Sequence, residues 1–253
     1  MNYQSLLSLA IDAAERASVE IMDVYRSGDF QAEAKGDNSP LTLADKRAHV
    51  VIVEVLKAGG LPVLSEEGAD VPYEVRRAWP SFWMVDPLDG TKEFLKRNGE
   101  FTVNIALIES GRPVLGVVAI PVSGEVFYAA KGGGAWLRQA GEEKRLPARP
   151  RADLQAPGLR VVASRSHANA ETEQFIAALK DPVLVSKGSS LKFLLLAEGK
   201  ADVYPRCAPT MEWDTAAAHA VVQEVGLRVK QYGKEEELVY NKEDLLNPYF
   251  LVG

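Results

Sequence analysis

The stretch that begins at residue 82 reads Phe82-Trp83-Met84-Val85-Asp86-Pro87-Leu88-Asp89-Gly90-Thr91. Its first four side chains are bulky and apolar, which predicts a buried strand that stops at Asp86. Pro87 fixes its own backbone φ and Gly90 permits a tight turn, so we expect a turn directly after the strand. Such a turn can direct the carboxylates of Asp86 and Asp89, with the Leu88 carbonyl between them, toward one point.

Outward from this stretch, hydrophobic periodicity predicts the other elements. On the N-terminal side it predicts helices over 5–25 and 42–58, and a strand over 61–64 that leads into Ser65-Glu66-Glu67-Gly68. On the C-terminal side it predicts strands over 102–108, 114–120 and 125–130, and then a polar connection over 138–158. Beyond the connection it predicts strands over 159–163, 183–185 and 201–204 that alternate with helices over 170–179, 189–197 and 215–225.

This order of elements predicts an α/β protein in two halves. We expect residues 1–150 to form an α+β half that carries most of the candidate metal ligands. Residues 151–253 alternate strands with helices and form a smaller α/β half.

Composition sets the broad class of protein. The 253 residues are 47% apolar and 25% charged, as in an ordinary globular protein. A net charge of −6 argues against a nucleic-acid binder, but bound divalent cations can reverse the field of an acidic site, so a phosphorylated substrate is not excluded.

Cys207 alone cannot form an internal disulfide. With neither a signal peptide nor a membrane span expected, we predict a cytoplasmic location, with loose association with the inner membrane left open.

Four acidic residues follow predicted strands or precede a predicted helix: Glu66, Asp86, Asp89 and Asp214. Carboxylate oxygens suit Mg²⁺, which is held by a few carboxylates together with waters and substrate phosphate. Each residue also has a structural interpretation. Asp89 could cap the following helix, Glu66 could lie in a solvated first turn, and Asp214 could be an N-cap.

Thr42 and Asp45 leave a similar choice open. Thr-x-x-Asp is close to a capping box, which has Glu or Gln at its last position. Alternatively, Asp45 could accept a proton from a hydroxyl that activates water. The spacing is the same for both interpretations.

The motifs together resemble those of the inositol monophosphatase superfamily of Mg²⁺-dependent, lithium-sensitive phosphatases. One signature is Trp83 through Thr91, and the other is Glu212-Trp213-Asp214-Thr215-Ala216-Ala217. Within the superfamily the chain is most similar to the bacterial 3'(2'),5'-bisphosphate nucleotidases. That likeness is carried by the runs 37–42, 86–94, 96–104, 164–167, 188–193 and 204–206.

The resemblance implies a fold, a cofactor and roles for individual residues. The fold is the layered αβαβα sandwich of the sugar phosphatases, with the site between the two halves. Two or three Mg²⁺ ions would be bound by Glu66, Asp86, the Leu88 carbonyl, Asp89 and Asp214. Thr91 and Asp45 would orient and deprotonate the attacking water, and the Gly90 and Thr91 N–H groups would face the phosphate. The implied substrate contacts are Glu66, Leu88, Asp89, Gly90, Thr91, Ser164, His167, Ser190, Lys192 and Asp214.

The resemblance also implies a small phosphorylated nucleotide as substrate. We expect hydrolysis of adenosine 3',5'-bisphosphate to AMP and phosphate by metal-activated water, a role in sulfur metabolism, and a monomer or homodimer. Inositol-specific members carry a Glu between the Ala-Asp-x-Tyr strand and the Trp-Asp motif. Here residues 205–211 contain no carboxylate, but they do contain Arg206. An inositol or sugar monophosphatase remains the alternative, and a non-catalytic metal- or nucleotide-binding regulator is a second one. Lys192 could instead be a solvated helix charge, and His167 a loop residue without a ligand.

Overall fold

The computed structural model describes residues 2–34, 40–68, 71–163 and 169–253. Its helices are α1 (Tyr3–Ser27), α2 (Leu43–Leu56), α3 (Tyr73–Arg76), α4 (Thr91–Leu95), α5 (Ala170–Ala177), α6 (Leu191–Ala197) and α7 (Glu212–Glu224), with 3-10 turns η1 (Lys57–Gly59) and η2 (Glu66–Gly68). The strands up to the middle of the chain are β1 (Glu33–Ala34), β2 (Pro40–Leu41), β3 (Val63–Ser65), β4 (Ser81–Asp89), β5 (Thr102–Glu109), β6 (Arg112–Ile120), β7 (Glu125–Ala130), β8 (Ala135–Gln139) and β9 (Glu142–Arg145). The remaining strands are β10 (Arg160–Ala163), β11 (Val183–Ser186), β12 (Tyr204–Arg206), β13 (Val229–Gln231) and β14 (Phe250–Val252).

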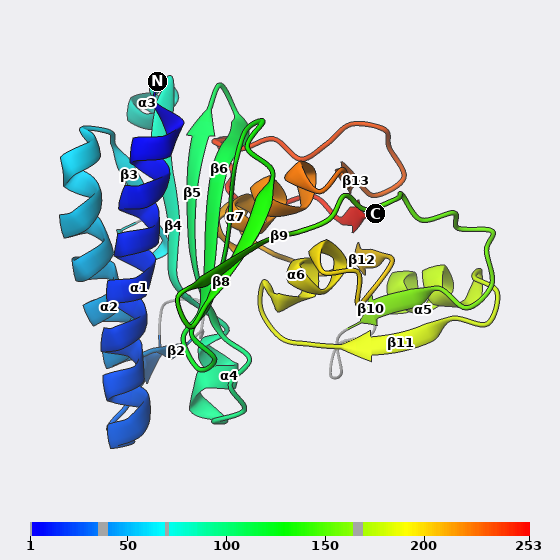
Figure 1. Ribbon diagram of the computed structural model, residues 1–253, viewed down its shortest axis with the longest axis horizontal. Coiled ribbons are helices and arrows are strands. Elements are labelled where there is room, and N and C mark those ends of the chain that lie inside the picture. Colours follow the sequence, from blue (N-terminus) through cyan, green and yellow to red (C-terminus); the bar gives the residue numbers. More distant parts are fainter. Residues whose placement is uncertain (1, 35–39, 69–70, 164–168) are drawn as a thin grey trace.

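The elements stack in five layers, which confirms the predicted αβαβα sandwich (Figure 1). Helices α1 and α2 cover one face of a mixed seven-stranded sheet, β3 to β9 in sequence order. Helices α6 and α7 cover its other face. Beyond them lie β10 and β11, and the sheet β12-β14-β13, joined by a parallel bridge between Val161 and Val203. Helix α5 packs on the far side through Phe175 and Ile176.

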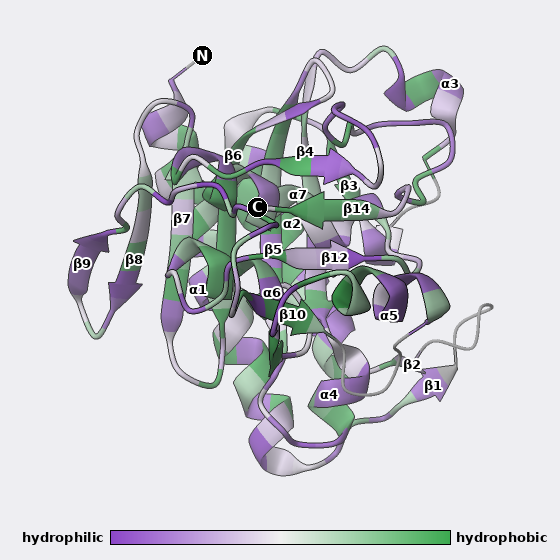
Figure 2. Cartoon of the chain, turned by 90° about the vertical axis from the view of Figure 1, so that its right-hand side faces the viewer, coloured by the Kyte–Doolittle hydropathy of each residue, from purple (hydrophilic) through white to green (hydrophobic). Residues whose placement is uncertain are grey.

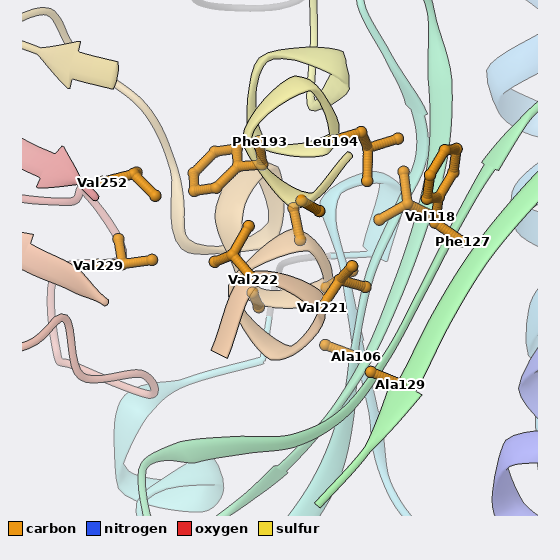
Figure 3. Close-up of a cluster of buried hydrophobic side chains, with 14 of the residues drawn as sticks. Ala106, Val118, Phe127, Ala129, Phe193, Leu194, Val221, Val222, Val229 and Val252 are labelled. Carbon is orange, nitrogen blue, oxygen red and sulfur yellow. The ribbon is translucent and has the colours of Figure 1, made fainter. Parts of the chain in front are cut away.

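The large sheet is buried on both faces, and its central strands are accordingly apolar over most of their length. Toward α1 and α2 the core contains Trp83, Ile105 and Val117. Toward α7 it contains Ala106 and Val118, which pack with α7, α6 and the small sheet (Figure 3). This second cluster mixes residues from both sides of residue 150, so the two predicted halves share one core. The boundary itself stays a prediction.

Two sequence expectations about the strands of the large sheet were wrong. The first is the connection over 138–158, because it contains the second strand of a hairpin, β9. That strand reads Glu142-Glu143-Lys144-Arg145, is exposed along its length, and is coloured as hydrophilic at the edge of the molecule in Figure 2. Strand prediction relies on apolar side chains, and a charged edge strand has none.

The second wrong expectation is that the strand stops at Asp86. Strand β4 runs on to Asp89 and pairs with β5 up to Asp86 and again at Asp89. Asp86 pairs with Asn104 and Asp89 with Thr102, so β4 has one residue more than β5 in this interval, which is a β-bulge. Pro87 has no N–H to donate and is tolerated in a strand at such irregularities.

None of the described helices is both long enough and apolar enough to cross a membrane.

Gly116 sets the distance between the large sheet and α7. A Cβ added to Gly116 would lie 2.1 Å from the Ala217 carbonyl oxygen, so helix backbone lies directly on the strand. We therefore expect Gly116→Ala to lower the free energy of unfolding in urea by about 3 kcal/mol. Val122→Ala, at a half-exposed turn nearby, should change it by less than about 0.5 kcal/mol. Equal stability of the two variants would contradict this packing.

Candidate active site

The bulge in β4 brings Asp86 and Asp89 to the same side of the strand. Side chains alternate along a strand, so residues three apart would normally face opposite sides. The extra residue in the bulge reverses that alternation. Asp86 Oδ1 also accepts the Leu88 N–H at 3.0 Å, which fixes this carboxylate.

Asp214 reaches the same point from the second half of the chain. It lies in the first turn of α7, where its Oδ2 accepts the Met211 N–H at 2.9 Å. One carboxylate oxygen each from Asp86, Asp89 and Asp214 lies within 4.8 Å of the others. The N-cap interpretation of Asp214 is therefore wrong, since Met211 holds that position, but the carboxylate does hydrogen-bond the helix start.

Glu66 follows β3, which pairs in parallel with β4 so that Ser65 lies beside Val85. The next residue of each strand is a carboxylate, Glu66 and Asp86, and the side chains of these two residues interact by hydrogen bond and charge. The parallel pairing thus adds Glu66 to the acidic cluster.

The cluster is electrostatically unbalanced. Burial, followed by the charges of Glu66, Asp89 and Asp214, raises the pKa of Asp86 well above its ordinary value. Burial and the nearby Asp89 raise the pKa of Asp214 to about 8. Buried carboxylates that repel one another call for a cation. Because every donor is a hard oxygen, this set fits Mg²⁺.

Asp45 takes part in both arrangements that its spacing allows. Its Oδ2 accepts the Thr42 N–H at 2.7 Å, which completes a capping box at the start of α2. Its Oδ1 accepts the Thr91 hydroxyl at 3.2 Å. That hydroxyl also lies 3.2 Å from the Leu88 carbonyl oxygen, so Thr91 connects Asp45 to the β4 bulge.

Gly90 lies between the bulge and α4 in a left-handed conformation, with φ of 94°. A Cβ there would lie 2.9 Å from the Glu100 carbonyl oxygen and 3.2 Å from Ser189 Cβ. Only glycine fits this position without strain.

A cleft of about 410 Å³ opens in front of Asp89 and Asp214. Lys192 and Arg206 line it, as do Lys92, Lys96 and Lys187. Lys192 is 8% exposed and donates to the Ser189 carbonyl oxygen at 2.8 Å, so its interpretation as a solvated charge is wrong. Burial lowers the pKa of Lys192 to about 8, although the Asp89 carboxylate opposes that shift.

The remaining expected substrate contacts have different positions. Ser190 is buried. Its N–H and its hydroxyl both donate to Asp89 Oδ2, at 2.7 and 2.9 Å. Ser164 and His167 lie outside the described residues, so their roles stay predictions.

Sequence reasoning assigned no role to Asn104 or Glu100. Asn104 is a buried amide beside Asp89, and Glu100 accepts the Gly188 N–H at 2.8 Å. The available signal for Asn104 was a polar residue inside the apolar run 102–108, because such a residue needs a buried partner.

Behind Asp214, helix α7 is held by a buried polar network. Glu212 accepts the N–H groups of Asn241 and Lys242 and pairs with the Lys242 ammonium. Two turns further along α7, His219 Nδ1 lies 2.9 Å from the Tyr240 hydroxyl. Burial lowers the pKa of His219 to about 4.

His219 should make stability depend on pH. Between its ordinary pKa of 6.5 and its folded value of about 4, the unfolded chain takes up a proton that the folded protein does not. The contribution of neutral His219 to the free energy of unfolding is therefore complete above pH 6.5. It is lost as pH falls toward 4, by about 3 kcal/mol in all. Urea unfolding at pH values of about 7, 6 and 5 should show that the free energy of unfolding falls more steeply with falling pH in the wild type than in His219→Asn. Parallel curves would contradict a buried neutral histidine.

Comparison with known proteins identifies the family of the chain. The model of the inositol monophosphatase family matches residues 2–249. The 3'(2'),5'-bisphosphate nucleotidase CysQ of Escherichia coli K12 is 47% identical over 251 residues, which cover 98% of this chain and 99% of that protein. The protein of the same name from Haemophilus influenzae is 32% identical, over 98% of this chain and 93% of that protein.

Among solved structures, CysQ from Bacteroides thetaiotaomicron has a TM-score of 0.88 and 49% identity. The match covers 99% of this chain and 97% of that one, and the structure is described as a bacterial member of the inositol monophosphatase family. The similarity extends over the whole layered sandwich.

Proposed function

The chain belongs to the inositol monophosphatase family and is a phosphoric monoester hydrolase, and from that premise we propose that it is a Mg²⁺-dependent 3'(2'),5'-bisphosphate nucleotidase. It hydrolyses adenosine 3',5'-bisphosphate to AMP and phosphate. The observation that carries this proposal is a cleft lined by cationic side chains, Lys192 and Arg206 among them, directly beside an acidic cluster. The names of the relatives support the same substrate class.

Two or three Mg²⁺ ions would be held by Glu66, Asp86, the Leu88 carbonyl, Asp89 and Asp214. When bound, the ions neutralise the clustered charge, bind the phosphate and make a water easier to deprotonate. The backbone N–H groups of Gly90 and Thr91, at the start of α4, are assigned to the phosphate oxygens.

Thr91 and Asp45 are assigned to the attacking water. A water that donates to Thr91 Oγ1 passes a proton, by way of the threonine hydroxyl, to Asp45 Oδ1 at 3.2 Å. Asp45 keeps its orientation because its other oxygen is held by the Thr42 N–H. The water oxygen attacks phosphorus in line, and the bond from phosphorus to the ribose 3'-oxygen breaks. The 3'-oxygen takes a proton from a solvent water to become the alcohol, and the proton held by Asp45 returns to solvent.

The second phosphate of the substrate is assigned to Lys192, Arg206 and Ser186. All three line the cleft. Within the described part of the chain, Arg206 Nε and Ser186 Oγ are buried without a hydrogen-bond partner, which favours a ligand that brings acceptors. Two cations and a hydroxyl suit a phosphate better than the hydroxyl groups of a polyol. Ser164 and His167 are retained as proposed nucleotide contacts.

Phosphate release from adenosine 3',5'-bisphosphate and from inositol 1-phosphate, measured side by side, tests this function. We expect the nucleotide to be hydrolysed at least about 100-fold more efficiently, because two cations of the cleft, Lys192 and Arg206, are assigned to its second phosphate. EDTA should abolish both activities. Asp89→Asn, which should fold but lack a proposed metal ligand, is the inactive control.

Equal or better hydrolysis of inositol 1-phosphate would replace this proposal with the inositol monophosphatase alternative. Substrate binding without turnover would support the non-catalytic regulator. Lithium inhibition, a role in sulfur metabolism, a cytoplasmic location and the oligomeric state remain predictions.

A further inference from the structure

Asn104 is a buried amide at the back of the acidic cluster. It lies on β5 opposite Asp86 and is 1% exposed, so it is separated from the cleft by other side chains. It does not line the cleft. An amide buried in an apolar strand must find partners for its N–H₂ and its carbonyl, and those partners define what it does.

The orientation of the Asn104 amide is set by Thr102. The Thr102 hydroxyl lies 3.2 Å from Asn104 Oδ1, two residues earlier on the same face of β5. That contact turns the amide nitrogen toward the cluster. Nδ2 lies 2.8 Å from Ser190 Oγ and 3.5 Å from Asp89 Oδ2.

Ser190 continues the chain of hydrogen bonds to Asp89. Its hydroxyl accepts from Asn104, so its single proton points away from the amide. Asp89 Oδ2 and the Asp214 carbonyl oxygen, each 2.9 Å away, are the acceptors for that proton. The Ser190 N–H adds a second bond to Asp89 Oδ2, at 2.7 Å.

All these bonds to the Asp89 carboxylate converge on one oxygen. Oδ2 is occupied by Ser190 and Asn104, which leaves Oδ1 as the oxygen for a cation. Protein groups that fix the orientation of a metal ligand typically change metal affinity by about 10- to 100-fold when removed.

We infer that Asn104 is a positioning residue for the metal site and that it acts through Ser190 on Asp89. The inference rests on the proposed function, because it takes Asp89 as a metal ligand. It gives Ser190 a different role from the substrate contact expected from the sequence. It also ties the loop that carries Ser186, which lines the cleft, to a carboxylate of the first half of the chain.

The test is the affinity of substrate-free protein for Mn²⁺. It is measured by titration, with the electron paramagnetic resonance signal of free Mn²⁺ as the readout. We expect Asn104→Ala and Ser190→Ala each to weaken Mn²⁺ binding by about 10-fold or more. Thr102→Ser, which keeps the hydroxyl that orients the amide, should bind Mn²⁺ like the wild type. At saturating Mg²⁺, KM for the substrate should stay within about twofold of the wild-type value, because neither side chain contacts it.

Two results would overturn the inference. One is wild-type Mn²⁺ affinity in Ser190→Ala with a raised KM, which would make Ser190 a substrate contact. The other is unchanged Mn²⁺ affinity in Asn104→Ala with a lowered Tm in EDTA, which would make Asn104 purely structural. If Asn104→Ala both binds Mn²⁺ weakly and loses stability, Ser190→Ala decides, since it removes only one hydroxyl. Failure of the wild type to bind Mn²⁺ would instead contradict the proposed function.

Discussion

The mutual repulsion of three closely placed carboxylates, the buried Asp86 and the partly buried Asp89 and Asp214, is the constraint on which the rest of this structure depends. Charges held this close inside a protein are costly unless they are neutralised by protons or by a cation. Burial and neighbouring carboxylates together raise the pKa values of Asp86 and Asp214, and burial raises the pKa of Asp89 although the Lys192 ammonium opposes that shift. The surrounding fold must therefore hold the carboxylates together against a force that separates them, and the need for a cation follows from the same arrangement.

Two features of the fold supply that restraint. The β4 bulge puts Asp86 and Asp89 on one side of a strand that is buried on both faces. Helix α7 brings Asp214 to them because Gly116 lets its backbone rest directly on β6. The first turn of α7 is held from behind by Glu212 and its bonds to the segment near Lys242. The cationic cleft lies on the open side, where an anionic substrate can complete the balance of charge.

Much of the fold could be predicted because its helices and central strands bury regular apolar patterns. The acidic residues could be singled out because they lie at the ends of such patterns. What could not be predicted depends on tertiary contacts. Strand β9 is charged throughout and has no apolar pattern, and the bulge was interpreted as a turn because Pro87 and Gly90 suit both. The bond from Asn104 to Ser190 joins residues 86 apart in the chain, so local sequence carries no sign of it.

The central claim is that the carboxylate cluster is completed by a cation, and the Tm with and without Mg²⁺ tests it most directly. If Mg²⁺ binds the folded cluster, Tm should rise with its concentration, by the equivalent of about 2.7 kcal/mol at a hundredfold excess over Kd. Ca²⁺-free buffer with EDTA gives the baseline, and Asp89→Asn should show little of the rise. A Tm that is independent of Mg²⁺ in the wild type, or one that rises equally in Asp89→Asn, would contradict the account.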